Sequence, residues 1–317
     1  MAFQRIPLPE NNNDLSEVLM AVLQQVVVLF LMAALGFLLT WRKVWNDHSV
    51  KSVTSMVILI STPCLNFSKL YHLPQGTLSG DWLICFFLSM ALTSVMLGIG
   101  YLIFRKHPKD ERAVFAQLTA LSNCGFMGYP VMEAAFGEVV VGYGVAFVTA
   151  FNIVSWSIAL ALFCKDFKAG LKKMVNPTMG GIALALVLQL LNWQLPKVIV
   201  DVVDAMSNLA TPLAMMVAGA YFGKITVDML KNKSFLLTCF LRLIVMPLFC
   251  LGVLKLCGMT GEVGAAIFVA CCMPGASNTL VQATAYSTDH AKELAVGAVA
   301  LTTILCVGTI PLMMLLW

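Results

Sequence analysis

Two long apolar stretches of the sequence are interrupted by polar and helix-breaking residues. The first interruption runs from Ala120 to Pro130 (ALSNCGFMGYP) and the second from Cys271 to Thr279 (CCMPGASNT). A chain that crosses a bilayer must satisfy its backbone hydrogen bonds internally, so unwound backbone survives there only inside protein or against a watery cavity. Because interrupted helices of this kind form binding sites in transporters, we predict a binding site where the two interruptions meet.

Each interruption should end in a fresh half-helix that attracts an anion. The first N–H groups of a helix have no intrahelical partner, and they carry about half a positive charge. We expect the helices to resume near Val131, after Pro130, and near Thr279, after Asn278. Together these ends can receive a carboxylate without a buried lysine or arginine, while the unwound carbonyls can coordinate a cation or polarise a water molecule.

Small and cyclic residues in the interruptions set the backbone geometry. Gly125, Gly128 and Gly275 are expected to permit close backbone approach and unusual dihedral angles. Pro130 and Pro274 remove backbone donors and block continuation of a helix.

Asparagine side chains are the leading candidates for contact with a substrate. Asn123 and Asn278 lie in the two interruptions, and each amide offers both donors and acceptors. The alternative is that they satisfy carbonyls freed by the breaks. Ser277 and Ser122 are weaker candidates because small hydroxyl residues also serve helix packing, and Asn66 is a polar residue in an apolar span that can line the cavity.

Two charged residues in apolar stretches have alternative interpretations. Glu133 follows the first interruption, where it can carry a coupling proton or occupy the first turn of a half-helix, a favourable place for an acid. Arg242 can attract an anionic substrate or pair with Asp201 or Asp204. The favoured interpretation of Arg242 is that its side chain snorkels to the cytoplasmic interface, about two helical turns away.

The composition is that of a membrane protein. Hydrophobic residues make up 60% of the chain, charged residues only 11%, and the mean hydropathy is +0.88. A membrane-spanning helix needs about 20 mostly apolar residues. Ten candidate spans follow, of which the second and sixth are the least apolar or the shortest: 18–40, 50–68, 82–104, 113–137, 139–163, 177–193, 199–222, 234–256, 262–286 and 293–316.

The positive charges indicate the orientation in the membrane. Most of the 20 lysines and arginines fall in alternate loops between the predicted spans. The positive-inside rule makes these loops cytoplasmic, which places both termini outside. No cleavable signal is expected, because the segment before the first span is acidic rather than basic.

Short motifs recur at a nearly constant spacing. Thr62-Pro63 recurs as Thr211-Pro212, an offset of 149, and Phe136-Gly137 matches Tyr286-Ser287 at an offset of 150. Chance remains an alternative, since proline is common in transmembrane helices. Two halves of five spans would be inverted relative to each other. The predicted organisation is a first repeat at 1–163 with its N-terminus outside, a cytoplasmic linker at 164–176, and a second, inverted repeat at 177–317 with its C-terminus outside.

Three motifs resemble the auxin efflux carrier family of membrane transporters. SNCGFMGYPVMEAAFG is similar to the family's fourth-helix pattern, and MPGASNTLVQATAYSTD is similar to its ninth-helix pattern. The run from Asn208 to Ala214 resembles a seventh-helix motif, and the resemblance covers essentially the whole chain. It implies an all-α membrane protein of ten transmembrane helices, with broken helices 4 and 9 crossing at mid-membrane, related in fold to bile-acid sodium symporters. The short 164–176 segment favours a bacterial permease type.

The function expected from these features is secondary transport of a small organic anion, a carboxylate such as malate or an auxin-like acid, in the plasma (cytoplasmic) membrane. A sodium-coupled symporter of the bile-acid type and a non-transporting sensor remain alternatives. An enzyme is not expected, because the chain lacks catalytic motifs such as H-E-x-x-H or G-x-S-x-G. No cofactor, metal or nucleic acid is expected; the partners are the substrate and membrane lipids, and a homodimer is left open.

Overall fold

The computed structural model describes residues 12–74, 76–78, 80–163 and 176–317. Regular structure in these residues is helical, with one isolated antiparallel bridge between Ser122 and Gly275. The predicted linker at 164–176 lies outside the described residues, except for Asn176, whose side chain caps the next helix by accepting a hydrogen bond from the Met179 N–H.

The helices of the first half of the chain are α1 (Asn12–Trp41), α2 (Asp47–Met56), η1 (Val57–Ser61), α3 (Thr62–Tyr71), α4 (Gly80–Ile103), α5 (Lys109–Ala120), η2 (Cys124–Gly128), α6 (Tyr129–Phe136), α7 (Glu138–Val154) and η3 (Ser155–Ala159). Those of the second half are α9 (Pro177–Leu190), α10 (Lys197–Asn208), α11 (Ala210–Ala220), η4 (Phe222–Lys224), α12 (Val227–Lys231), α13 (Lys233–Phe240), η5 (Leu241–Val245), α14 (Met246–Leu256), α15 (Glu262–Cys272), α16 (Ser277–Tyr286) and α17 (Asp289–Met314).

Seven helical stretches of the described residues are long and apolar enough to cross a membrane. They confirm seven of the predicted spans as helices, including the weakly apolar second one. The other three predicted spans form shorter helices: α9 has 14 residues, and the spans at 113–137 and 262–286 are interrupted as expected. The seven stretches are Ser16–Trp41, Asp47–Tyr71, Gly80–Ile103, Glu138–Ala159, Lys197–Lys224, Lys233–Leu256 and Asp289–Met314.

Three of the four π-helical turns in the described part of the chain end two positions before a proline. The turns η1, η2 and η5 are each followed by an α-helix whose second residue is proline, namely Pro63, Pro130 and Pro247. Proline has no N–H to donate and its ring clashes with the carbonyl four residues earlier. A wider π turn relieves that clash, and such turns are frequent at functional sites.

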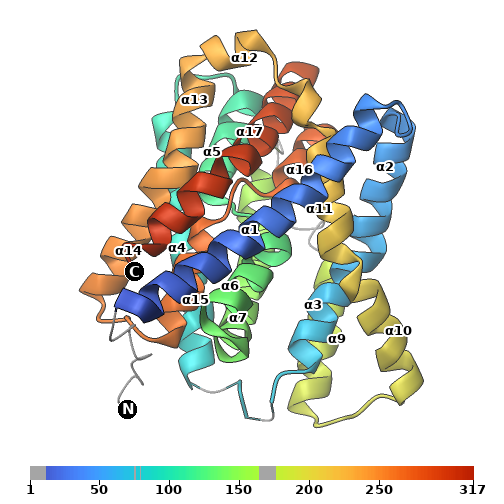
Figure 1. Cartoon of the computed structure of the whole chain (residues 1–317), viewed down its shortest axis with the longest axis vertical. Helices are drawn as coiled ribbons and strands as arrows, with labels where there is room; N and C mark the ends of the chain where they lie inside the picture. Colours follow the sequence, from blue (N-terminus) through green and yellow to red (C-terminus); the bar gives the residue numbers. More distant parts are fainter. Residues whose placement is uncertain (1–11, 75, 79, 164–175) are drawn as a thin grey trace.

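Figure 1 shows two groups of helices joined by α1, which runs diagonally across the front of the molecule. We call α2, α3, α9, α10 and α11 the panel, and α4 to α7 with α13 to α17 the core group. Within the panel, α3 packs against α9 and α10; within the core group, α7 packs against α4 and α15, and α5 against α17. The start of α1 and the end of α17 lie at the same end of the molecule.

The two interrupted segments lie at the centre of the core group. Residues 113–120 of α5 and 263–272 of α15 are all buried. A helix that is apolar on every side is covered by protein rather than by solvent, and small residues such as those of the GAA run in α15 let neighbouring backbones approach closely. The breaks are therefore enclosed by other helices.

Backbone contact between α1 and α11 fixes α1 to the panel. A Cβ atom added to Gly219 would lie 1.7 Å from the Ala33 carbonyl oxygen, and one added to Gly36 would lie 1.9 Å from the Met216 carbonyl oxygen. Only glycine permits this separation, which is how small residues bring membrane helices together.

We predict that Gly219→Ala separates α1 from α11 and lowers the free energy of unfolding by about 1–3 kcal/mol, the usual cost of overpacking. Thermal unfolding of the purified protein in detergent measures the effect. Gly98→Ala is the matched control, because a Cβ atom there meets nothing within 4 Å. Equal melting temperatures for the two variants would contradict the prediction.

Candidate functional site

The first break occupies Leu121 to Asn123. Helix α5 ends at Ala120, Leu121 is extended, and helical structure resumes as the π turn η2 at Cys124. The prediction that the helix resumes near Val131 is therefore wrong. The reason is that the π turn η2 accommodates Pro130, so the proline lies inside the half-helix instead of ending the break.

The second break occupies Met273 to Ala276. Helix α15 ends at Cys272, Met273 and Ala276 are extended, and α16 begins at Ser277, two residues before the predicted restart. The N–H of Gly275 donates a hydrogen bond to the Thr302 hydroxyl oxygen of α17, at 3.1 Å. This side chain satisfies a backbone donor that the break would otherwise leave without a partner.

The two breaks cross and bond to each other. The Asn123 N–H donates to the Pro274 carbonyl at 2.8 Å, and the Ala276 N–H donates to the Leu121 carbonyl at 3.0 Å. These two bonds form the antiparallel bridge between Ser122 and Gly275, whose numbers differ by 153. Exchanging the segments at that offset turns one hydrogen bond into the other, so the local pairing is symmetric.

Backbone strain does not explain the glycines of the breaks. Positive φ values occur at Gly76, Gly137 and Gly258 but not at Gly125, Gly128 or Gly275, so the expectation of unusual dihedral angles is wrong. Lack of space explains Gly275, because an added Cβ atom would lie 3.2 Å from a methyl carbon of Leu118 and 3.3 Å from the Thr302 hydroxyl.

A cavity opens beside the crossing, and we call it the crossing cavity. It collects six of the predicted site residues, along with Asn152 of α7, which the sequence analysis missed. Asn66, Asn123 and Asn152 are buried, and Asn278 is partly buried. The lining residues are Thr62, Leu65, Asn66, Ser122, Asn123, Gly125, Phe126, Val148, Phe151, Asn152, Ala276, Ser277 and Asn278.

The amides of this cavity have hydrogen-bonding capacity left. Asn66 and Asn152 each donate Nδ2 to the carbonyl four residues earlier, both at 2.9 Å. Asn278 makes one long contact, 3.5 Å from Nδ2 to the Ser155 hydroxyl, and the side chain of Asn123 makes no hydrogen bond to the described residues. Because each amide has two donor hydrogens, the cavity retains donors for a ligand.

A second cavity lies between the panel and the core group, and we call it the wide cavity. It shares Thr62, Phe126, Ser277 and Asn278 with the crossing cavity, so the Phe126 ring borders both spaces. The rest of its wall is mainly apolar and includes Ile58, Trp156, Val217, Tyr221 and Leu280.

The remaining predicted site residues lie outside both cavity walls. Gly128 and Pro130 lie in η2 and α6, after the first break, whereas Pro274 and Gly275 lie in the second break. Glu133 is exposed and lies near the end of α6, not in the first turn of a half-helix, so that structural alternative is wrong. Its role in proton coupling stays a prediction.

Arg242 does not snorkel. Its side chain is 1% exposed, and Nη1 donates to the carbonyls of Thr119 at 3.2 Å and Ala120 at 2.9 Å, while Nη2 donates to the carbonyl of Cys271. The proposed pairing with an aspartate is also wrong, because Asp204 instead bonds Ser68 and His72. The carbonyls freed at the two breaks offset the cost of burying the guanidinium.

A hydrogen-bonded network of buried amide side chains lies next to Asn278. Gln117 of α5 donates Nε2 to the Gln282 Oε1 atom at 2.8 Å, and Gln282 of α16 donates Nε2 to the Ser155 carbonyl at 2.9 Å. The sequence analysis missed both glutamines. The available signal was a polar amide inside an apolar span, which is expensive there and often functional.

The geometry suits capture of an anion. Half-helices η2 and α16 both begin at the crossing cavity, so their first N–H groups, with about half a positive charge at each end, face the same region as the amides. In the described part of the chain, no group of three His, Cys, Asp or Glu side chains is placed to hold a metal ion. The site can thus bind an anion through neutral donors and helix ends.

Comparisons with known proteins cover most of the chain. The family model described as "Membrane transport protein" matches residues 21–174 and 165–314. An uncharacterized transporter of Methanothermobacter thermautotrophicus is 24% identical over 310 residues, which cover 93% of this chain and 98% of that protein. An uncharacterized transporter of Methanocaldococcus jannaschii is 24% identical over 284 residues, covering 83% and 89% respectively.

We predict that Gln282→Met lowers the free energy of unfolding by about 1–3 kcal/mol, because it leaves the buried amide of Gln117 and the Ser155 carbonyl short of a partner. Thermal unfolding in detergent tests this. Gln24→Met is the control for the same chemical change, since Gln24 is exposed on α1. A melting temperature unchanged in Gln282→Met would show that the network does not stabilise the fold.

Proposed function

The chain belongs to the membrane transport protein family, which includes the auxin efflux carriers, and on that premise we propose that it is a secondary transporter of a small organic anion. The substrate is a carboxylate such as malate or an auxin-like acid, and it crosses the membrane by alternating access. One observation carries the proposal: two half-helix N-termini and four asparagine side chains meet at one cavity beside the crossing breaks.

The proposed membrane topology has ten crossings. Seven are the long apolar helices, and the other three are α9 and the interrupted pairs α5–α6 and α15–α16. With an even number of crossings, both termini lie on one side. The start of α1 and the end of α17 at the same end of the molecule support this count. We place the protein in the plasma (cytoplasmic) membrane, with the basic loops inside and the number of subunits left open.

We further propose that the two halves are inverted repeats. The antiparallel bridge between the breaks, with hydrogen bonds that exchange at an offset of 153, supports a local two-fold relation. The close packing of α1 with α11 and of α3 with α9 provides further support, because each pair joins one helix from each half. The offsets of 149 and 150 differ from 153 because the second half has four additional residues before the crossing, between Thr211 and Gly275, and the first half has three additional residues after it, between Ser122 and Phe136.

In the proposed binding mode the carboxylate occupies the crossing cavity. The N–H groups that begin η2 and α16 stabilise its charge, and the amides of Asn123 and Asn278 donate to its oxygens. The rest of the substrate extends past Phe126 into the wide cavity, whose apolar wall excludes water. Charge-assisted hydrogen bonds of this kind contribute about 1.5–3 kcal/mol each.

The positions of the two cavities support the proposal of alternating access. Panel residues such as Thr54 and Val217 form one wall of the wide cavity, and core-group residues such as Leu280 form the other. Movement of the core group along the panel carries the crossing from one side of the membrane to the other. The contact between α1 and α11 keeps α1 with the panel during this movement.

The experiment that tests the function is a counterflow screen in proteoliposomes. Labelled aliphatic and aromatic carboxylates are presented with and without sodium and with and without a pH gradient. Exchange of at least one carboxylate, absent from empty vesicles, is the expected result. Binding of a carboxylate without exchange would favour a sensor, and strict dependence on sodium would favour symport of the bile-acid type.

We predict that Asn123→Ala and Asn278→Ala each raise the KM for the transported carboxylate about tenfold or more, since one charge-assisted hydrogen bond is lost and each 1.4 kcal/mol corresponds to a factor of ten. Initial rates of uptake measure the change. Asn208→Ala serves as the control, because Asn208 is exposed and lines neither cavity. Unchanged KM values in both site variants would remove these amides from the binding site.

Glu133 provides a separate test of proton coupling. If it carries the coupled proton, Glu133→Gln abolishes the pH dependence of uptake, because the amide cannot titrate. Uptake measured from acidic to alkaline pH, beside Glu138→Gln as an exposed acidic control on α7, decides the question. An unchanged pH profile in Glu133→Gln excludes this role.

A further inference from the structure

Arg242 holds the only buried charge among the described residues, and the hydrogen bonds that its guanidinium donates all go to backbone carbonyls. Its acceptors are Thr119 and Ala120, at the end of α5, and Cys271, at the end of α15. No carboxylate of the described chain lies within ion-pairing distance of the guanidinium. The countercharge must therefore come from the two helix ends.

The charges of this arrangement balance. The C-terminal end of a helix carries about half a negative charge, so two ends that meet supply about one. The guanidinium supplies one positive charge, and this charge is permanent because arginine does not lose its proton in proteins. Its planar fork also reaches both helix ends at once, which a compact ammonium group does not do.

We propose that Arg242 is a built-in counter-cation for the crossing breaks, and that it takes the carbonyl positions which a sodium ion would need, so that transport does not depend on sodium. This inference rests on the proposed transport function. In transporters with broken helices, unwound carbonyls and half-helix C-terminal ends coordinate the coupling cation. Here the last carbonyls of α5 and α15 are already bound to the guanidinium.

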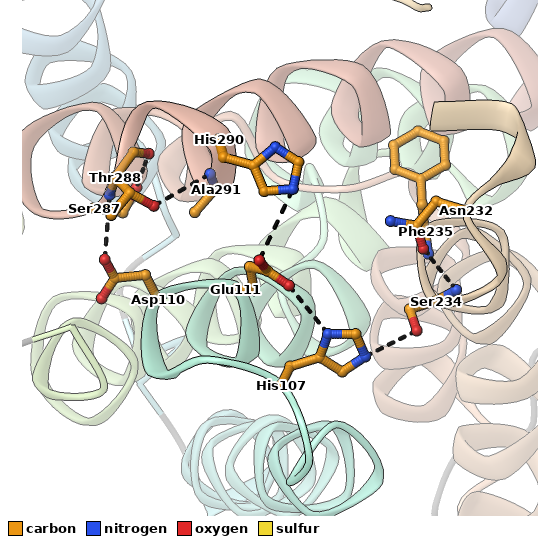
Figure 2. Close-up of polar contacts among 10 residues, drawn as sticks. All are labelled: His107, Asp110, Glu111, Asn232, Ser234, Phe235, Ser287, Thr288, His290 and Ala291. Atoms are coloured by element: carbon orange, nitrogen blue, oxygen red, sulfur yellow. Dashed lines mark hydrogen bonds and ion pairs between the residues drawn. The ribbon is translucent and has the colours of Figure 1, made fainter. Parts of the chain in front are cut away.

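Figure 2 shows contacts that join the helical stretch of Arg242 to α5 and its preceding loop. The side chain of His107, just before α5, contacts the Ser234 hydroxyl of α13 at 2.9 Å and Glu111 of α5 at 3.1 Å. Glu111 also lies 3.8 Å from His290 of α17. These contacts link the first turns of α13 and α17 to α5.

Arg242 and the contacts of His107 with Ser234 and Glu111 join the same two helical stretches at two heights along their axes. Ser234 and Arg242 are eight residues apart on one helical stretch, which corresponds to about 12 Å along the axis. The stretch formed by α13 and η5 is thus held to His107, just before α5, through Ser234, and to the end of α5 through Arg242. The counter-cation therefore moves with the crossing and remains bound on both sides of the transport cycle.

The test uses Arg242→Ala, which leaves the carbonyls without a cation and opens a space of guanidinium size. We expect this variant to lose at least tenfold in the initial rate of carboxylate uptake and to melt at lower temperature than the unmodified protein in detergent. Millimolar guanidinium, far below the molar concentrations that denature proteins, should restore both properties in part. Sodium should leave uptake by the unmodified protein unchanged relative to choline.

Two further variants separate the charge from the packing. Met246→Ala removes a buried side chain one helical turn beyond Arg242, and guanidinium should not restore it. Arg242→Lys keeps the charge but not the fork, and its loss of uptake should be smaller than that of Arg242→Ala. If Arg242→Ala cannot be purified, the rise in yield when guanidinium is present during solubilisation gives the same readout.

The outcomes distinguish this inference from the transport proposal. Rescue of the melting temperature by guanidinium, in a protein that exchanges no carboxylate, would support the counter-cation and overturn the transport function. Uptake without any rescue of Arg242→Ala, or uptake by the unmodified protein that requires sodium, would overturn the counter-cation and leave transport in place.

Discussion

The structure depends on one constraint: backbone groups kept away from water must find hydrogen-bond partners. The two breaks expose such groups at the centre of the core group, and the crossing satisfies many of them reciprocally. Leu121 and Asn123 bond with Ala276 and Pro274, and Thr302 accepts from Gly275. Neither break could exist alone at this depth, so each interrupted segment requires the other, and the surrounding helices have to hold both in register.

The backbone groups that the crossing leaves without backbone partners form two sets of opposite partial charge. The first N–H groups of η2 and α16 remain on the side of the crossing cavity, while the last carbonyls of α5 and α15 lie on the side of Arg242. Antiparallel crossing produces this division, because it brings two like helix ends together on each side. The positive side has no fixed counterion among the described residues, and the negative side has one. That asymmetry favours an anionic ligand.

The breaks themselves could be predicted from the sequence, because Pro274, Gly275 and the glycines near Pro130 disrupt helices locally. Where the first helix resumes could not, because a π turn before Pro130 depends on how the chain is packed. The amides of Asn123 and Asn278 were found as polar residues within breaks. The prediction for Arg242 was wrong because a sequence shows how far a residue lies from the cytoplasmic end of its own helix. It does not show that the carbonyls at two other helix ends, near residues 120 and 271, lie beside that residue in the fold.

In the proposed transport cycle, a counter-cation attached to the chain changes the electrostatics. A coupling ion that binds and leaves would alter the charge of the crossing by one unit between the loaded and empty states. With Arg242 fixed to both breaks, the crossing keeps the same charge, and only the substrate alters it. Moving an empty crossing then moves about one unit of uncompensated positive charge, which the two N-terminal helix ends carry. A bound anion cancels this charge and so removes the energetic cost of moving it. The anion thereby favours movement of the loaded state over the empty one, which gives exchange of substrates a physical basis without a second ion.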